Sequence, residues 1–486
     1  MIGARDLLPV LPALVLVVTG LVVILLQAGA RRPQPGARPF AAVSLAGLSL
    51  AFFATWSIPK AQGCGACTPS LGGSLVGDGL ARMLGLLLIA TAAAVVLLVP
   101  AYGRKTDTDR GEVYGLMLFA VAGMLGLVSA VELVALFVAL EIMSVSLYAL
   151  AGLRRAQARS QEAALKYFVT GAFSSAFLLY GIALLYGITG TTNLARIASA
   201  LASPSRDPTT LAVALGLLLV GFGFKVACVP FHMWVPDVYE GAPTTVTTLM
   251  AAAVKAAAFG ALLRVTLFGL APLAYKWRPA LAGLAILTMI IGNLAALAQS
   301  NLKRMLAYSS IAHAGYMLTA FVAAPALAAE AVVFYLAGYA AVSVGAFGAL
   351  AALTREDREP STLADLAGLA ERRPALAAAI AVFMFSLTGV PVTAGFVGKL
   401  MVFRAAVAGG WAVLALVGVA MSLVSAYYYL RVVVAMYMRP PTGEEWPRIG
   451  GAAAVALTFA LLAILWLGVE PGRILDSVRS AVTGLR

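Results

Sequence analysis

Three lysines and one glutamate lie inside long apolar stretches of the sequence. Glu141 follows Leu133 by eight residues, or about 12 Å along a helix, and Lys255 follows Thr245 by ten residues, or about 15 Å. Both positions are close to the middle of a bilayer, whose hydrocarbon core is about 30 Å thick. The two other lysines, Lys225 and Lys399, also lie within apolar stretches. Because a charge at this depth costs about 2.5–3.5 kcal/mol on insertion scales, each one needs a partner or a function.

These residue types suit proton transfer inside a membrane. A buried amine holds its proton weakly, and a carboxylate that approaches it strengthens that hold. Approach and withdrawal of Glu141 at Lys225 would therefore act as a switch. A released proton would pass to Lys255 and then to Lys399. The alternative is a set of permanent structural ion pairs, but one acid among several bases favours a relay, because a structural network should balance its charges.

Three further residues are candidates for the same relay. Lys166 lies one turn into its apolar stretch, where a long side chain can also reach the membrane surface. His232 and His313 are the only histidines, and imidazole exchanges protons near neutral pH. Capping, packing or a hydrogen bond to a neighbour is the alternative role for each histidine. We expect His313 to connect Lys255 with Lys399.

Two apolar stretches are interrupted next to a lysine. Pro230 follows Lys225, and Gly389 and Pro391 precede Lys399. Proline removes a backbone donor and clashes with the preceding turn, so we expect both helices to break at depth. Breaks of this kind persist in a membrane only where protein surrounds them or where they line a water-filled cavity.

The elements that carry these residues must be membrane helices. Of the 486 residues, 62% are hydrophobic and 11% are charged, whereas soluble domains are about half apolar and a quarter charged. We predict an all-α integral membrane protein with about fourteen transmembrane helices, because about 20 apolar residues cross a bilayer. The stretches lie near 7–28, 40–58, 77–100, 112–131, 133–153, 162–187, 210–228, 245–270, 279–298, 304–324, 327–353, 375–408 (long and broken), 411–438 and 450–469.

The expected breaks fall in the seventh and twelfth helices, five helices apart. A five-helix unit repeated in tandem enters the membrane from the opposite side, so we expect two inverted repeats, helices four to eight and nine to thirteen. Broken helices at matching positions of inverted halves typically mark an ion site. The predicted division is an N-terminal three-helix segment, the two repeats, and a last helix with its tail: 1–111, 112–270, 271–440 and 441–486.

The basic residues are unevenly distributed and predict the topology. Loops after odd-numbered helices hold most of them, for example Arg104 and Lys105, or Arg154 and Arg155. By the positive-inside rule these loops are cytoplasmic, which places both termini on the outer side. We assign the net charge of +13 to topology and lipid headgroups rather than to nucleic acid, because no basic segment is interleaved with aromatic residues.

The cysteines and the missing motifs bear on cofactors. Cys64 and Cys67 form a C-x-x-C in a loop predicted to lie outside, where a disulfide is possible, and no second pair completes a metal site. Cys228 lies inside a helix and is assigned to packing. The sequence has no glycine-rich nucleotide motif and no cysteine cluster. We therefore expect no cofactor in this chain and no electron transfer through it.

Two segments resemble the signatures of a known family. GFGFKVACVPFHMWVPDVYEGAPTTVTTLMAAAVKAAAFG (221–260) and NLKRMLAYSSIAHAGYML (301–318) are similar to the helix seven to eight and helix ten signatures of the antiporter-like membrane subunits of respiratory complex I. Mrp cation/proton antiporters and membrane-bound hydrogenases share this family. The turn at 234–239 reads WVPDVY, where two of the three complex I types typically read WLPDAH. This difference from the other two types, and the lack of a long lateral extension, favour the third type of antiporter-like complex I subunit.

The resemblance implies a proton-translocating subunit of NADH-quinone oxidoreductase, driven by electron transfer elsewhere in the complex. It matches the family's charged residues of helices five, seven, eight and twelve to Glu141, Lys225, Lys255 and Lys399. Lys166 matches a lysine thought to lie near Glu141, and the role of Glu132 stays open.

The resemblance also implies partners, cofactors and a location. FMN, iron–sulfur clusters and quinone would belong to partner subunits of a bacterial inner-membrane complex. The expected partners are neighbouring membrane subunits, a peripheral redox arm and lipids. One alternative is a subunit of an Mrp-type Na+/H+ antiporter or of a membrane-bound hydrogenase. Another is a scaffold that seals a complex without conducting protons.

Overall fold

The computed structural model describes residues 7–29, 38–58, 68–203, 207–356, 358–441 and 446–483. In this part of the chain thirteen helices are long and apolar enough to cross a membrane, which confirms the all-α membrane class. They are α2 (Leu11–Gly29), α3 (Arg38–Trp56), α4 (Gly79–Thr106), α5 (Gly111–Ser129), α6 (Leu133–Ala151), α7 (Ala158–Thr189), α9 (Pro208–Val226), the span Thr244–Gly269, α13 (Ala274–Leu297), α14 (Leu302–Leu318), α15 (Pro325–Ala352), α19 (Ala412–Met438) and α20 (Gly451–Val469).

A fourteenth span is divided between two shorter helices. α17 (Pro374–Thr388) and α18 (Ala394–Ala408) lie in the apolar stretch 375–408, which is broken and too long for a single span. Each of the fourteen predicted stretches therefore corresponds to a helix or a broken pair of helices. The inverted relation between the two groups of five helices stays a prediction.

Short elements connect the spans. They include the helices α8 (Leu194–Leu201), α10 (Trp234–Gly241) and α16 (Leu369–Arg372), and an antiparallel hairpin of β1 (Thr68–Ser70) and β2 (Leu75–Gly77). A further short helix, α21 (Gly472–Thr483), follows the last span. The hairpin is the only β-sheet in the described residues and was not predicted, because three-residue strands leave no periodic pattern. Cys64 and Cys67, and with them the possible disulfide, lie outside the described residues.

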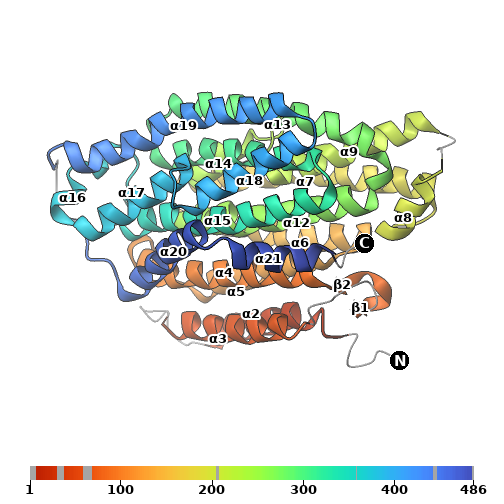
Figure 1. Cartoon of the computed structure of the whole chain (residues 1–486). Coiled ribbons are helices and arrows are strands. Elements are labelled where there is room, and N and C mark those ends of the chain that lie inside the picture. Colours follow the sequence, from red (N-terminus) through yellow and green to blue (C-terminus); the bar gives the residue numbers. More distant parts are fainter. Residues whose placement is uncertain are drawn as a thin grey trace.

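The helices pack side by side, with α2 and α3 along one side of the molecule and α13 and α19 along the opposite side (Figure 1). Between them lies the span Thr244–Gly269, which consists of α11 (Thr244–Leu249), a π-helical turn (Met250–Val254), α12 (Lys255–Arg264) and a second π-helical turn (Val265–Gly269). We call it the central span. All residues of its most apolar 18-residue segment are buried, whereas only 22% of the residues in the corresponding segment of α2 are buried. Lys255 therefore lies on the helix that is most enclosed by protein.

Both predicted helix breaks are present. α9 ends at Ala227, whose φ of 65° is left-handed, and α10 begins at Trp234 after the turn that contains Pro230. α17 ends at Gly389, with φ 90°, and Pro391 lies in the five residues before α18. The chain must also approach itself closely here, because a Cβ on Gly395 would lie 1.7 Å from the carbonyl oxygen of Ser386. These local features confirm the breaks in the seventh and twelfth spans.

Candidate functional site

Lys225 lies in the last turn of α9, just before the break, and is 4% exposed. Its Nζ donates to Ser144 Oγ on α6 at 2.7 Å. The rings of Phe224 and Tyr148 lie 5.6 and 5.7 Å from this nitrogen. Among the described residues, no carboxylate lies within ion-pair distance of Lys225. The amine is therefore held by a hydroxyl and aromatic faces rather than by a permanent counter-ion.

Glu141 lies on α6 three residues before Ser144, on the same face of the helix. Its carboxylate accepts a hydrogen bond of 2.5 Å from Ser175 Oγ on α7. Glu141 and Lys225 are thus held by neighbouring hydroxyls without direct contact between their charges. This arrangement agrees with the two members of the predicted switch being close but separated.

Lys255 directly follows the π-helical turn of the central span and is 2% exposed. Its Nζ donates to both oxygens of Ser310 on α14, at 2.5 Å to the carbonyl and 2.6 Å to Oγ. The ring of Tyr339 lies 5.5 Å from the same nitrogen. Neutral oxygen atoms again take the place of a carboxylate. Turns of π-helix often occur at functional sites, because they change the direction in which a side chain leaves the helix.

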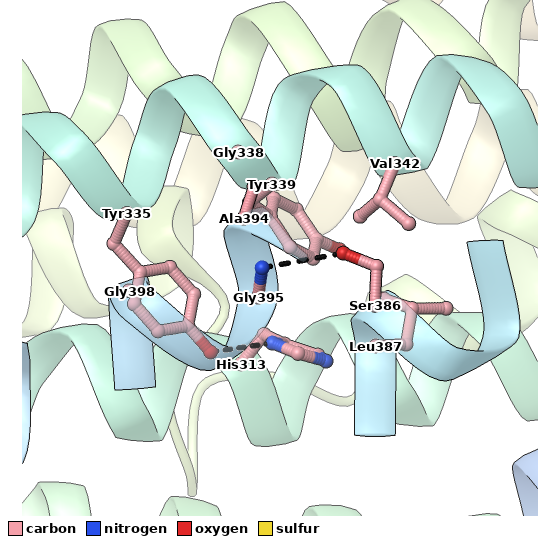
Figure 2. Close-up of a pocket in the computed structure, with 10 residues that line it drawn as sticks. All are labelled: His313, Tyr335, Gly338, Tyr339, Val342, Ser386, Leu387, Ala394, Gly395 and Gly398. Atoms are coloured by element: carbon pink, nitrogen blue, oxygen red, sulfur yellow. Dashed lines mark hydrogen bonds between the residues drawn. The ribbon is translucent and has the colours of Figure 1, made fainter. Parts of the chain in front are cut away.

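His313 follows Ser310 by three residues on α14 and is completely surrounded by protein. Its Nδ1 shares a hydrogen bond of 2.7 Å with the hydroxyl of Tyr335 (Figure 2). Its Nε2 shares one of 3.1 Å with the hydroxyl of Tyr429. Tyr429 also forms a hydrogen bond with Ser309. Because a hydroxyl can donate or accept, both ring nitrogens can exchange a proton with a neighbour.

Lys399 lies on α18 opposite the end of α17. Its Nζ donates to the carbonyls of Leu387 and Thr388 at 3.0 and 2.8 Å, and to Ser422 Oγ at 2.7 Å. The two carbonyls belong to the last turn of α17, where a helix leaves its final acceptors without intrahelical partners. The break beside Lys399 therefore creates the polar site that holds its amine.

A small cavity lies between His313 and the break in the twelfth span. It is lined by His313, Tyr335 and Tyr339 and by Ser386 and Gly395, which are joined by a hydrogen bond (Figure 2). The space open to the centre of a water molecule is about 10 Å³, about enough for one water.

An aromatic ring bridges the remaining gap to Lys399. Tyr316 packs edge-on against His313, with ring centroids 5.5 Å apart, and its ring lies 5.0 Å from Nζ of Lys399. The structure thus brings His313 between Lys255 and Lys399, as expected.

Lys166 does not lie where the resemblance implies. Its Nζ pairs with Glu162 at 2.6 Å and with Asp237 at 2.7 Å, and its side chain is 43% exposed. Ser175, which holds Glu141, lies nine residues further along α7, or about 13 Å at 1.5 Å per residue. The expectation that Lys166 lies near Glu141 is therefore wrong for this structure. Lys166 belongs to a charged surface cluster instead.

That surface cluster includes two acids that were not among the predicted relay residues. Asp237 and Glu240 lie on α10 and accept hydrogen bonds from Arg304 at 2.7 and 3.1 Å. Partial burial would raise the pKa of Asp237, but hydrogen bonds from Lys166 and Arg304 outweigh it and lower this pKa. A cavity of about 180 Å³ lies beside the cluster. Acids near helix ends give no sign in the sequence of the distant basic residues that they will face in the folded protein.

His232 and Glu132 stand apart from the lysines. His232 follows the break in the seventh span, and its Nδ1 is buried without a hydrogen-bond partner in the described part of the chain. Glu132 accepts hydrogen bonds from Ser74 at 2.8 Å and from Thr192 at 2.6 Å. It thereby ties the β1–β2 hairpin to the loop after α7, so a connecting role is assigned to a residue whose role was open.

Two buried groups with counter-ions were not predicted. Arg264 pairs with Asp78, and Glu359 pairs with Lys303 and Arg154. Arg264 lies nine residues after Lys255 in an apolar stretch, so its depth was a signal in the sequence. Glu359 carried none, because it lies in a polar connection between spans.

Comparison with known proteins agrees with this geometry. Residues 130–425 match the family model described as NADH:quinone oxidoreductase/Mrp antiporter, TM. The chain therefore belongs to the NADH:quinone oxidoreductase/Mrp antiporter family of membrane proteins. Within that family, a protein of Trichlorobacter lovleyi named NADH-quinone oxidoreductase subunit N is 42% identical over 97% of this chain and 96% of its own length. Subunit N is the third of the three complex I types.

Solved structures share the fold. A chain of respiratory complex I from Thermus thermophilus with bound aureothin has a TM-score of 0.81 at 39% identity, covering 97% of this chain and 100% of its own. A chain of the Mrp complex from Dietzia sp. has a TM-score of 0.85 at 23% identity, covering 98% of this chain and 97% of its own. The second likeness concerns the fold alone.

Proposed function

We propose that this chain is the proton-translocating membrane subunit of an NADH-quinone oxidoreductase. One observation carries the proposal: three lysines deep in the membrane domain have hydroxyl and carbonyl partners, and none of them contacts a carboxylate of the described residues. An amine in such a site can lose its proton without leaving a buried carboxylate unpaired, whereas a tightly paired amine is held in its charged form.

The proposed relay runs from one broken span to the other. Glu141 sets the proton affinity of Lys225 by moving between Ser175 and the neighbourhood of Ser144. The proton then passes to Lys255. From there Ser310 and His313, with the tyrosine hydroxyls around the imidazole, lead to Lys399. In the proposal His232 serves the first break as a proton acceptor, and Lys166 supplies charge at the surface.

The energy for this transport must come from partner chains. Each charge moved against 100 mV requires about 2.3 kcal/mol. The proposal places FMN, iron–sulfur clusters and quinone in those partners, which would be neighbouring membrane subunits and a peripheral redox arm. It places the complex in the bacterial inner membrane, with both termini outside. It also keeps the division into two inverted five-helix repeats, 112–270 and 271–440.

A subunit of an Mrp-type Na+/H+ antiporter or of a membrane-bound hydrogenase is the second candidate. The relatives at 38–46% identity carry the name of the oxidoreductase subunit, whereas the Mrp chain at 23% identity supports a common fold only. The first candidate is therefore preferred.

Reconstitution of the purified complex in liposomes tests the proposal. Wild type, Lys225→Ala and Lys255→Met should be compared for NADH oxidation with quinone and for acidification of the lumen, with Lys276→Ala as the matched lysine control. We expect coupled loss of both activities in the two core variants and wild-type behaviour in the control. Unaltered turnover and proton yield in an intact complex would refute the relay, and Na+-dependent transport without NADH would favour the antiporter.

A further inference from the structure

The central span carries Lys255 near its middle and has a buried charged network at each end. Its first residue, Thr244, precedes Lys255 by eleven residues, and Arg264 follows Lys255 by nine. Water could reach Lys255 along the surface of the central span from either side of the membrane. The groups at the two ends decide whether those routes are open.

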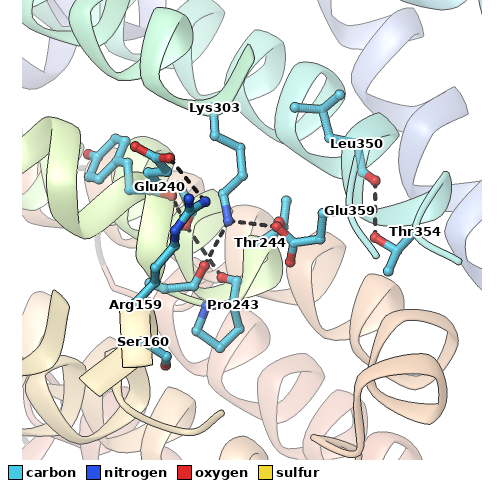
Figure 3. Close-up of polar contacts among 12 residues, drawn as sticks. Arg159, Ser160, Glu240, Pro243, Thr244, Lys303, Leu350, Thr354 and Glu359 are labelled. Atoms are coloured by element: carbon cyan, nitrogen blue, oxygen red, sulfur yellow. Dashed lines mark hydrogen bonds and ion pairs between the residues drawn. The ribbon is translucent and has the colours of Figure 1, made fainter. Parts of the chain in front are cut away.

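Glu359 closes the end at Thr244. Its carboxylate accepts from Lys303 at 2.9 Å (Figure 3). It also accepts from Arg154 at 3.2 Å and from the hydroxyl of Tyr102. The side chains of Glu359, Lys303 and Arg154 are 12%, 4% and 7% exposed. Burial alone would raise the pKa of Glu359, but the charges of Lys303 and Arg154 and the hydrogen bond from Tyr102 outweigh it and lower this pKa. The carboxylate is therefore ionised and enclosed.

The same network is attached directly to the start of the central span. Lys303 also donates to the carbonyl of Ala242 at 2.8 Å, and the hydroxyl of Tyr102 accepts from the backbone N–H of Thr244 at 3.1 Å. Tyr102 lies on α4, Lys303 on α14, and Glu359 in the connection between α15 and α17. One carboxylate thus joins three separate elements around the first turn of the helix that carries Lys255.

The pair of Asp78 and Arg264 closes the other end. Two guanidinium nitrogens of Arg264 donate to the two oxygens of Asp78 at 2.8 and 2.6 Å, and its Nε donates to the carbonyl of Val128 at 2.5 Å. Both side chains are 3% exposed. Asp78 also caps α4 by accepting from the N–H of Ala81. These contacts hold both charged groups within protein and join the end of the central span to the start of α4.

Not every charged group near the start of the central span is buried, as a neighbouring cluster shows. Arg304, the residue after Lys303, pairs with Asp237, and these two side chains are 31% and 30% exposed beside a cavity of about 180 Å³. Figure 3 places Glu240 of this exposed cluster close to Lys303 of the buried one. The first cluster is therefore much more accessible to solvent than the second, although adjacent residues of α14, Arg304 and Lys303, supply them.

We propose that Glu359 and the Asp78–Arg264 pair seal the two ends of the central span against water, so that protons reach Lys255 only sideways from the neighbouring lysine and histidine sites. The inference rests on the proposed relay function. These residues are positioning residues, because they hold helices together around Lys255 and do not themselves pass on its proton. A broken seal creates a water path from one surface to Lys255 and hence a passive proton leak.

The test is a leak measurement on the reconstituted complex without NADH or quinone. A pH gradient is imposed on the liposomes, and its decay is followed with a dye in the lumen for Glu359→Ala and Asp78→Ala. The control is Asp107→Asn. Asp107 also forms an ion pair, with Arg110, but its side chain is 90% exposed. We expect decay several-fold faster than wild type in the two seal variants and unchanged decay in the control.

The decisive arm repeats each seal variant with Lys255→Met. Since the leak must pass through Lys255, we expect the double variants to return to the wild-type decay. A leak that persists without Lys255, or no leak in assembled single variants, overturns the inference. If Glu359→Ala does not assemble, Glu359→Gln keeps the shape while removing the charge, and it must leak too.

The outcomes separate this inference from the proposed function. Loss of pumping in Lys255→Met without any leak in the seal variants overturns the seals and leaves the relay in place. Full pumping by Lys255→Met overturns both.

Discussion

The buried charges of this protein fall into two groups that differ in their partners. Lys225, Lys255 and Lys399, in the interior of the membrane domain, contact hydroxyls, carbonyls and aromatic rings. Glu359 and Asp78, at the two ends of the central span, form ion pairs with lysine and arginine. Depth of burial is similar in both groups, so the presence of a counter-ion is what distinguishes them.

This difference indicates which groups can exchange protons. A buried ion pair keeps both members charged, because removing either charge leaves the other uncompensated at a cost of about 3–5 kcal/mol. An amine held by neutral oxygen atoms gains less from its charge and can give it up. The core lysines are therefore suited to transport, whereas the paired groups are suited to holding helices in place.

The strongest test of the comparison is removal of one member of a locked pair. Asp78→Ala should destabilise the protein by about 3–5 kcal/mol, because Arg264 then remains charged and buried. Thermal unfolding of the purified complex and retention of the subunit during detergent extraction measure the effect. The reference is Asp107→Asn at the surface, and equal stability of the two variants would contradict the distinction.

Lys255→Met should show the opposite pattern. No carboxylate loses a partner, so stability should stay close to wild type, while proton pumping should fall by about 100-fold or more, the smallest usual contribution of a positioned proton-transfer group. Pumping is measured in liposomes and stability by thermal unfolding. Marked instability of this variant would mean that Lys255 has a structural role instead.

Gly389→Ala should have an intermediate effect at the second break. Its φ of 90° is unfavourable for any other residue, and an added Cβ would lie 3.0 Å from Cδ of Lys399. We expect a loss of about 1–2 kcal/mol in stability together with slower pumping, because Lys399 must move from its carbonyl site. Ala394→Gly, at the first residue of α18, tests whether backbone freedom alone explains any change.

Lys166→Ala should have a small effect. The side chain is 43% exposed, and its pairs with Glu162 and Asp237 are screened by solvent, so the expected loss of stability is below about 1 kcal/mol. Pumping at saturating substrate should change much less than in Lys255→Met. A loss of pumping as large as that of Lys255→Met would return Lys166 to the core of the relay.

The smallest effect is expected from pH. The pKa of Glu359 is lowered below the ordinary 4.5 of glutamate, so its stabilising contribution is complete above that value and is lost only as pH falls through the lower value in the folded protein. The passive leak of the reconstituted wild type should therefore be equal at about pH 6 and pH 9. A leak that grows between these values in the wild type but not in Glu359→Gln would contradict this expectation.

Much of the fold could be predicted because its signals are local. Apolar stretches of sufficient length specify spans, and Pro230, Gly389 and Pro391 disturb the helix at their own positions. The depth of Lys225, Lys255 and Lys399 follows from counting residues along those helices. Counting residues left Lys166 open, because a side chain at a helix end can turn toward either the interior or the surface. The resemblance placed it near Glu141, but Asp237 on another element decided the outcome.

The sequence by itself determined the membrane class, the spans, the two breaks and the presence of costly charges at depth. Only the tertiary structure decided which of those charges have counter-ions. The physical reason is range: hydropathy and backbone preference act within one helix, whereas an ion pair such as Asp78 with Arg264, 186 residues apart, forms only when distant helices pack together.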